Sequence, residues 1–241
     1  MKKKWIVGTR GSNLALKQAA SVVKMLQESY PDMQFSIKTI KTTGDSIWDK
    51  PLNMIGGKGL FVKEIEEALL TKQIDLAVHS MKDMPTELEN GLILGAVTKR
   101  EDPRDAFIST VYNSINSLKK KARIGTGSMR RKFQLLYHNR SLDIVPIRGN
   151  IDTRIKKMGQ LALDGIILAC AGIKRMGFED HIKEVIPLDI MVPPSGQGAI
   201  GIETREESDT LDMLKPLNHR KTFLEVSIER GLQSMIGGGC Q

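Results

Sequence analysis

The sequence predicts an α/β protein of two lobes that are similar in build and are joined by two crossovers. Three observations indicate this class. Strand-like apolar runs alternate with helical spacing up to residue 97, and the same order of elements begins again at Arg123. A strand-like run at 199–203 follows a Pro- and Gly-rich stretch. If that run rejoins the first sheet, lobe 1 is discontinuous, and two linkers allow the lobes to close on a ligand cleft between them.

Lobe 1 begins with a βαβαβ pattern. Trp5–Val7 reads as a buried strand, and a Gly-rich turn leads to a helix that Ser12 or Asn13 caps. Tyr-Pro-Asp at 30–32 ends that helix. The remaining predictions for this lobe are a strand at 35–39, a loop at 42–58, a helix with apolar positions from 61 to 69, and strands at 74–78 and 91–97.

Lobe 2 repeats this pattern. Arg123–Ser128 echoes Ile6–Ser12, with a strand, Gly-Thr and then Ser at a helix start. A charge-rich crossover at 99–105 precedes the repeat, and a second crossover at 193–198 follows it. The other predictions are strands at 106–109, 143–147 and 163–169, helices around Leu135 and at 151–158, and final helices at 209–214 and 220–236. We therefore expect lobe 1 at 1–95 and 196–216 and lobe 2 at 100–192, which leaves 217–241 outside both.

Composition excludes several classes of protein. The 241 residues are 40% hydrophobic and 27% charged, as in soluble globular proteins, and no apolar run nears the ~20 residues that span a bilayer. The apolar run after Lys4 is too short for a signal peptide, so we expect a cytoplasmic protein. Two cysteines and four histidines show neither a disulfide framework nor zinc spacing, so we expect no metal. The net charge of +8 indicates an anionic partner, and 5% aromatic residues argue against nucleic acid.

The stretch Ala77–Pro85 carries the first candidate site. A buried strand ends there in Ser-Met-Lys-Asp-Met-Pro, so Lys82 and Asp83 lie at a strand end, where α/β proteins present their chemistry. Asp83 is either the working carboxylate of an enzyme or a residue that caps a turn. His79 could act as a base, but a hydrogen-bonded structural histidine is favoured because no carboxylate partner for it is evident.

Arginines beside helix starts form the second candidate site. A helix N-terminus that follows Gly-Thr offers free N–H groups to an anion. The residues at the two such turns are Arg10 and Ser12 in lobe 1, and Thr126, Ser128, Arg130 and Arg131 in lobe 2. Arg148 and Arg154 flank a third helix start, and Arg175 follows a strand. Each alone is more often an ion-pair residue, but six arginines placed after strands suit small carboxylates, which arginine binds with two hydrogen bonds.

Three further residues stand in glycine- or alanine-rich stretches. Lys58 lies in Gly-Gly-Lys-Gly, which lacks the spacing of a nucleotide-binding P-loop, so a flexible loop with one useful lysine is favoured over nucleotide hydrolysis. Cys240 follows three glycines and is accessible as a nucleophile or an attachment point, or is an incidental terminal thiol. Cys170 lies among small and apolar residues and is expected to be a core residue.

Seven stretches form a pattern that runs the length of the chain. They are Gly-Thr-Arg-Gly-Ser-Asn-Leu-Ala-Leu (8–16), Gly-Gly-Lys-Gly-Leu-Phe-Val-Lys-Glu (56–64), Ala-Val-His-Ser-Met-Lys-Asp-Met-Pro (77–85), Arg-Glu-Asp-Pro-Arg-Asp-Ala (100–106), Arg-Gly-Asn-Ile-Asp-Thr-Arg (148–154), Gly-Gln-Gly-Ala (196–199) and Gly-Gly-Cys-Gln (238–241). In content and order they closely resemble one family, the hydroxymethylbilane synthases, also called porphobilinogen deaminases. The resemblance implies two periplasmic-binding-protein-like lobes and a third, smaller α+β domain.

The resemblance also implies an activity, a monomeric cytoplasmic transferase of haem biosynthesis that binds neither nucleic acid nor membrane. Four porphobilinogens would be deaminated and joined head to tail into hydroxymethylbilane, on a dipyrromethane cofactor held by a thioether to Cys240. Asp83, with Lys82 beside it, would contact pyrrole N–H groups, stabilise the cationic azafulvene formed on ammonia loss and help to move protons. The implied cofactor contacts are Asp83, Lys58, Thr126, Ser128, Arg130, Arg131, Arg154 and Gln197, and the implied substrate contacts are Arg10, Ser12, Arg148, Arg154 and Arg175.

The chain departs from the family pattern in three places. Gly127 stands where the family usually has a hydroxyl residue, and Pro194-Ser195 before Gly-Gln-Gly is atypical. Family members continue into the third domain, so we expect residues 217–241 to be its first helix and cysteine loop, with most of that domain absent. A second hypothesis, from another class, is a two-lobed protein that binds an anionic pyrrole-type ligand without turnover. Asp83 and Cys240 discriminate the two, because a pure binding protein needs neither.

Overall fold

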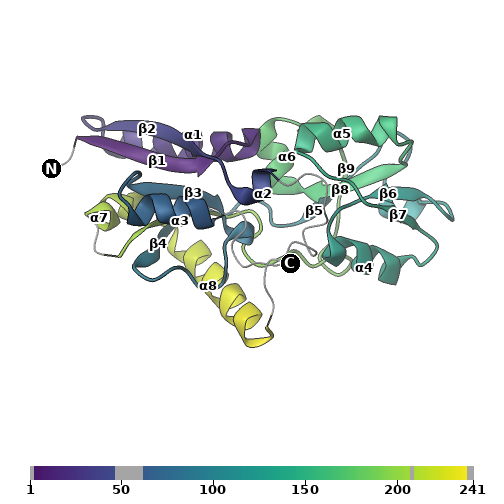
Figure 1. The fold of residues 1–241 in the computed structure, drawn as a ribbon. Helices are drawn as coiled ribbons and strands as arrows, with labels where there is room; N and C mark the ends of the chain where they lie inside the picture. The colour runs from purple at the N-terminus through teal and green to yellow at the C-terminus, as the bar shows by residue number, and fades with distance from the viewer. Residues whose placement is uncertain (1–2, 47–61, 207–208, 238–241) are drawn as a thin grey trace. The chain divides into compact units, whose positions relative to one another are not determined.

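The computed structural model describes residues 3–46, 62–206 and 209–237. The chain divides into two compact units, both drawn in Figure 1. Unit 1 comprises Met1–Arg100 and Ala199–Gln241, and unit 2 comprises Glu101–Gly198. Unit 1 is therefore discontinuous, because the chain leaves it, folds unit 2 and returns. Within the described ranges, none of the helices is long and apolar enough to cross a membrane.

Unit 1 is built on a five-stranded sheet in the order β2-β1-β3-β10-β4. Its strands are β1 (Lys4–Arg10), β2 (Gln34–Ile40), β3 (Leu76–Ser80), β4 (Leu92–Val97) and β10 (Ile200–Arg205). β1, β2 and β3 are parallel, and β10 runs antiparallel between β3 and β4. The strand predicted at 199–203 thus rejoins the first sheet, which confirms the two crossovers.

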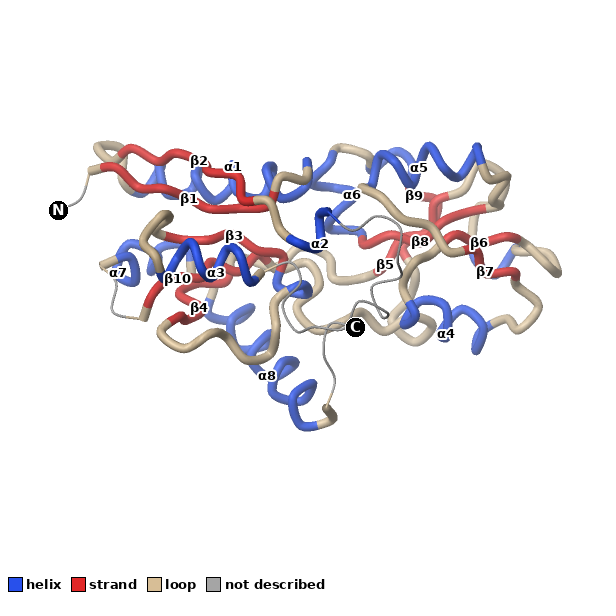
Figure 2. Tube along the Cα trace, in the orientation of Figure 1, coloured by secondary structure: helices blue, strands red, loops and turns tan. Residues whose placement is uncertain are grey.

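Helices cover both faces of this sheet (Figure 2). The described helices of unit 1 are α1 (Asn13–Ser29), α2 (Thr43–Ser46), α3 (Lys63–Leu70), α7 (Thr210–Leu214) and α8 (Arg220–Met235), with 3-10 turns η2 (Met81–Asp83) and η5 (Lys215–Leu217). α1 is amphipathic because Ala19, Val22 and Leu26 recur at three- and four-residue spacing, and they pack with α7 against one face. α3 packs Ile65 and Leu69 against the other face.

Unit 2 repeats this arrangement, with the sheet order β7-β6-β8-β5-β9. Its strands are β5 (Asp105–Ile108), β6 (Arg123–Gly125), β7 (Asp143–Val145), β8 (Gly165–Ala169) and β9 (Ile182–Val185). Its helices are α4 (Met129–His138), α5 (Ile151–Gln160) and α6 (Cys170–Met176), with 3-10 turns η3 (Ile115–Ser117) and η4 (Glu179–His181). Leu135 of α4 packs on one face, and α5 and α6 pack on the other.

The two units share the local bonds that join their first and third strands. In unit 1, Asp75 donates its N–H to the Ile6 carbonyl at 2.9 Å and accepts the Ile6 N–H on its carboxylate at 2.8 Å. In unit 2, Asp164 makes the same pair of bonds with Arg123, at 2.8 and 2.7 Å. The sequence echo between the lobes is therefore a structural repeat.

Two glycines occupy equivalent places in this repeat. A Cβ on Gly8 of β1 would lie 2.3 Å from Ile74 Cδ1, and a Cβ on Gly125 of β6 would lie 2.7 Å from Leu163 Cδ1. Real Cβ contacts are not this short, so a larger residue at either position would require the side chain two residues before the third strand to move. The Gly-Thr signal read from the sequence thus serves packing as well as the turn.

The sequence does not predict three short elements, α2, α6 and β9. The loop predicted at 42–58 is wrong at α2, and the part of it from residue 47 onwards lies outside the described residues. β9 is an edge strand with Lys183 and Glu184 at its centre, so it lacks an apolar alternation and depends on its pairing with β5. α6 has seven residues and starts directly after β8, so little helical periodicity can be read from it.

Candidate functional site in unit 1

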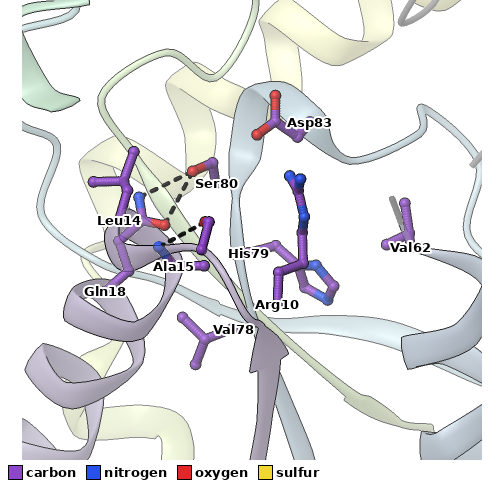
Figure 3. Close-up of a pocket in the computed structure, with 10 residues that line it drawn as sticks. Arg10, Leu14, Ala15, Gln18, Val62, Val78, His79, Ser80 and Asp83 are labelled. Carbon is purple, nitrogen blue, oxygen red and sulfur yellow. Dashed lines mark hydrogen bonds between the residues drawn. The ribbon is translucent and has the colours of Figure 1, made fainter. Parts of the chain in front are cut away.

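A pocket opens at the carboxyl ends of β1 and β3 (Figure 3). The residues that line it are Arg10, Ser12, Leu14, Ala15, Gln18, Val62, Val78, His79, Ser80 and Asp83. Figure 3 shows the Arg10 side chain extending from its strand toward Asp83. Three of the predicted site residues, Arg10, Ser12 and Asp83, thus come together in one pocket. Lys82 is not among the residues that line it.

Asp83 is held at the pocket by the methionines on either side of it. Met81 and Met84 are 2% and 5% exposed, and they pack with Val97 and Ala199. The Met81 N–H donates to the Ala199 carbonyl at 3.1 Å, and the Met84 N–H closes the 3-10 turn on the Met81 carbonyl at 3.2 Å. Because the methionines anchor the turn, the half-buried Asp83 between them is turned toward the pocket. The Met-Lys-Asp-Met spacing therefore presents Asp83 at the end of β3, where the sequence predicted it.

The opposite wall is the first turn of α1. Ser12 is the N-cap, and its Oγ accepts the Ala15 N–H at 3.3 Å. Gln18, one turn further on, is hydrogen-bonded to Ser80 Oγ at 2.9 Å, which fastens α1 to the end of β3 (Figure 3). These bonds fix the helix N-terminus beside Arg10, so the wall offers a guanidinium and a helix start to an anion.

His79 has a carboxylate partner, contrary to the sequence interpretation. Its Nε2 lies 3.0 Å from Glu203 Oε2, and the two side chains are 5% and 0% exposed. The two atoms are close enough for an ion pair, but neither forms a hydrogen bond of normal geometry with any of the described residues. Glu66 of α3, 7% exposed, interacts electrostatically with both. Burial, and then the Glu203 charge, raise the pKa of Glu66 to about 7.

Glu66 should make the protein less stable as the pH rises. The unfolded carboxyl releases its proton near pH 4.5 and the folded one near 7, so between these values the folded state binds more protons and stability falls with pH. We expect the wild type to lose about 2 kcal/mol of unfolding free energy between pH 5 and 8, relative to Glu66→Gln. Urea unfolding at both pH values measures this, with Glu67→Gln on the exposed side of α3 as the control. Equal pH dependence in Glu66→Gln and the wild type would refute it.

Candidate functional site in unit 2

The predicted arginines of the α4 turn converge on a buried carboxylate. Asp105, 0% exposed, accepts hydrogen bonds from Arg130 Nη2 at 2.6 Å and from Arg131 Nη2 at 2.7 Å. Gln197 Nε2 donates to the same carboxylate at 3.0 Å. Burial alone would raise the pKa of Asp105, but the two guanidinium groups hold it below its usual range. The three donors were among the residues predicted from the sequence, but their common acceptor was not.

Hydroxyl groups complete the same turn. Ser128 is the N-cap of α4, and its Oγ accepts the Arg131 N–H at 3.4 Å. The buried Thr126 accepts the Ser128 N–H on Oγ1 at 3.2 Å. A ten-residue helix that starts with this turn and two arginines carries positive charge beyond what Asp105 neutralises. The turn thus retains the character of an anion site.

The other predicted arginines of unit 2 are bonded to backbone carbonyls. Arg154 Nε donates to the Gly149 carbonyl at 2.7 Å, at the start of α5. Arg175 Nη2 donates to the Gly198 carbonyl at 2.6 Å. Arg148, also at the start of α5, is half-buried. These bonds fix Arg154 at the helix start where the sequence placed it, and Arg175 in the segment that follows β8.

Of the two cysteines and Lys58, Cys170 lies within the described residues. Cys170 is fully buried, and burial raises the pKa of its thiol to about 11, so the predicted core role is confirmed. Lys58 and Cys240 lie outside the described residues. Three buried acids, Glu66, Asp105 and Glu203, were not predicted. Only Glu203 left a signal in the sequence, because it is a lone charge that ends the apolar run from Ala199.

Solved structures with this architecture are similar in fold. A periplasmic substrate-binding protein of an ABC transporter from Coxiella burnetii aligns with a TM-score of 0.53 at 13% identity, over 98% of this chain and 99% of that one. Immunogenic lipoprotein A from Vibrio vulnificus aligns with a TM-score of 0.52 at 12% identity, over 92% and 98%. These likenesses confirm the predicted two-lobed, periplasmic-binding-protein-like fold and carry no function.

Sequence relatives are much closer. Residues 5–213 match the family model described as porphobilinogen deaminase, dipyromethane cofactor binding domain. The porphobilinogen deaminase of Syntrophomonas wolfei is 52% identical over 236 residues, which cover 98% of this chain and 77% of the relative. That of Desulforamulus reducens is 50% identical over 242 aligned positions, which cover 100% of this chain and 78% of the relative. The resemblance first seen in seven short motifs therefore extends along the whole sequence, and the chain belongs to the porphobilinogen deaminase family.

Proposed function

We propose that this chain is a hydroxymethylbilane synthase, which deaminates four porphobilinogens and joins them head to tail. One observation carries the proposal: in a chain half identical to porphobilinogen deaminases, Asp83 and Arg10 line one pocket. A carboxylate and a guanidinium in one small pocket suit a substrate with a pyrrole N–H at its centre and carboxylates at its edge.

The residues present fit a dipyrromethane cofactor, whose pyrroles carry carboxylates. The turn of unit 2 already binds one carboxylate, that of Asp105, through Arg130, Arg131 and Gln197. Since Arg130 keeps a 24% exposed side chain, the turn can present positive charge to a second. When bound, the cofactor supplies the pyrrole carbon to which the first substrate is joined. The residues we assign to hold it are Cys240, as a thioether, with Asp83, Lys58, Thr126, Ser128, Arg130, Arg131, Arg154 and Gln197.

Asp83 performs the central step in this proposal. Its carboxylate accepts a hydrogen bond from the pyrrole N–H of a bound porphobilinogen. As ammonia leaves the aminomethyl carbon, positive charge spreads onto the ring nitrogen, and the fixed negative charge of Asp83 stabilises it. The same carboxylate can then take up a proton that the ring loses. Lys82, its neighbour in η2, adds positive charge at this strand end.

Arginines position the substrate in the same proposal. Arg10 and Ser12 bind its carboxylates in unit 1, since they line the pocket with Asp83. We assign Arg148, Arg154 and Arg175 of unit 2 to substrate carboxylates as well. The carbonyl bonds of Arg154 and Arg175 support this, because a side chain already fixed loses less entropy when it binds an anion.

We further assign α8 to a third folding unit, which begins near residue 217. α8 carries an apolar stripe at three- and four-residue spacing: Leu224, Ile228, Leu232 and Met235, all more than half exposed. Such a stripe is typical of a helix that another element covers. Hydrogen exchange of α8, in this chain and in one extended with a relative's C-terminal sequence, tests this assignment. Equal protection of α8 in both chains would refute this assignment.

We also propose a cytoplasmic monomer, and a dimer mass by light scattering would refute the monomeric state.

A turnover assay tests the proposed function. Incubation with porphobilinogen should release ammonia and hydroxymethylbilane in a ratio of about four to one, as the joining of four aminomethylpyrroles requires. A chain that binds porphobilinogen but releases neither product would be a binding protein, and the enzyme proposal would fail.

A further inference from the structure

A row of three ionisable side chains, Arg10, His79 and Glu203, crosses the centre of unit 1, and two of them line the pocket. His79 on β3 pairs opposite Gly201 of β10, and Glu203 of β10 pairs opposite Ala77. Since side chains alternate along a strand, His79, Ala77 and Glu203 share one face, which is the face that α3 covers. The register Gly8↔Ala77 puts Arg10 of β1 beside His79, two residues further along both strands. His79 therefore stands on the strand between Arg10 and Glu203.

The fold does not need this row, because unit 2 lacks it. Through the registers Gly125↔Ile166 and Ile108↔Ile166, the positions of Arg10, His79 and Glu203 correspond to Gly127, Leu168 and Ile108. Leu168 and Ile108 are 3% and 1% exposed, so the same places in the repeated sheet form an ordinary apolar core. At these equivalent positions, the imidazole and the carboxylate thus occur only in the unit that also has an arginine in the row.

If Glu203 had no partner, it would disturb the arrangement of the side chains that line the pocket. A fully buried carboxylate without a cationic partner is strongly unfavourable, so it draws in any cation within reach. Glu66 gives no relief, because it too is an acid and repels Glu203 when ionised. The cation of the pocket wall next in line is Arg10. Figure 3 shows the imidazole of His79 below the Arg10 side chain, which extends away from it toward Asp83.

We propose that His79 is a positioning residue for substrate binding: it pairs with Glu203 and so prevents this buried carboxylate from drawing Arg10 out of the pocket. The inference rests on the proposed function, because it takes the carboxylates of porphobilinogen as the ligands of Arg10. It differs from a direct role of His79 toward the substrate in one respect. If His79 acts through Glu203, then removing both should repair what removing His79 alone damages.

The sister unit supplies the variants for this test, His79→Leu, Glu203→Ile and the double variant, which copy Leu168 and Ile108. In His79→Leu, we expect KM for porphobilinogen to rise roughly 10- to 100-fold, because the charged hydrogen bond between Arg10 and a substrate carboxylate is lost. The value of kcat should change less than about threefold. In the double variant we expect KM to return to within about threefold of the wild type, and stability to recover, since replacing both members of a buried polar pair by apolar side chains is often nearly neutral or stabilising. Calorimetric titration of porphobilinogen into the same variants carrying Asp83→Asn gives Kd without turnover.

Arg205→Met is the matched control. It removes a cationic partner of another buried acid of unit 1, with Arg205 Nη2 3.7 Å from Asp75 Oδ1, so it should lower stability and leave KM unchanged. A rise in KM that persists in the double variant would mean that His79 contacts the substrate directly, and unchanged KM and Kd in His79→Leu would mean that the row is structural. Either result overturns the inference and leaves the proposed function standing. A wild type that neither binds nor consumes porphobilinogen overturns both.

Discussion

Asp83→Asn should leave the protein folded and reduce kcat for porphobilinogen roughly a thousandfold. Asparagine has the same shape and can still accept a hydrogen bond from the pyrrole N–H, but it carries no negative charge. It therefore cannot stabilise the cation that forms as ammonia leaves, and it cannot take up a proton. KM should change little, because Arg10 and Ser12 remain in the pocket wall. Steady-state product formation measures both constants.

The control for this variant is Asp32→Asn. Asp32 is an exposed carboxylate two residues before the start of β2, at the end of the sheet away from the pocket. The variant therefore makes the same chemical change outside the site. It should have wild-type kcat. Thermal unfolding of Asp83→Asn should match the wild type, because the methionines on either side anchor the turn without the carboxylate. Near wild-type kcat in Asp83→Asn would remove Asp83 from the role we assign to it.

Asp105→Ala should lower the unfolding free energy by roughly 4 kcal/mol. The substitution leaves Arg131, 6% exposed, and the partly buried Arg130 without their acceptor. It also leaves the Gln197 amide without this bond. Urea denaturation measures the loss, and Asp105→Asn, which can keep some of these bonds, should lose less.

Asp143→Ala is the matched control for Asp105→Ala in unit 2. Asp143 Oδ2 lies 3.6 Å from Arg123 Nε, but the Asp143 side chain is 58% exposed, so its loss should cost less than about 1 kcal/mol.

The contribution of Asp105 to the unfolding free energy should also depend on pH. Because its pKa in the folded protein is lowered, the stabilisation is complete above the unfolded value of about 3.9 and is lost as the pH falls through the folded value. Equal stability losses at Asp105 and Asp143 would contradict this account of the turn.

The repeat of strands and helices could be predicted from the sequence because each strand is a short apolar run that ends in turn residues. Asp83 could be found for the same reason: it stands directly after such a run, and chain direction alone puts it at the sheet edge. Arg10 and Ser12 follow from the same rule applied to β1. That they share a pocket with Asp83 follows from the parallel pairing of β1 with β3.

The partners of the charged residues could not be predicted, because pairing depends on sheet order. Glu203 reaches His79 only because β10 is inserted beside β3, more than 120 residues further along the chain. Asp105 receives Arg131 and Gln197 from segments that lie 26 and 92 residues away. Nothing in the local sequence distinguishes an arginine that binds a ligand from one that binds such an internal carboxylate.

The central claim is that this chain carries a covalent pyrrole primer on Cys240, and intact-protein mass spectrometry tests it most directly. After porphobilinogen is supplied, we expect the wild-type mass to exceed the sequence mass by two linked pyrrole units. Cys240→Ala should show the unmodified mass, and Cys170→Ala should carry the adduct, because the buried Cys170 thiol has a raised pKa. An unmodified wild-type chain after exposure to porphobilinogen would contradict the account.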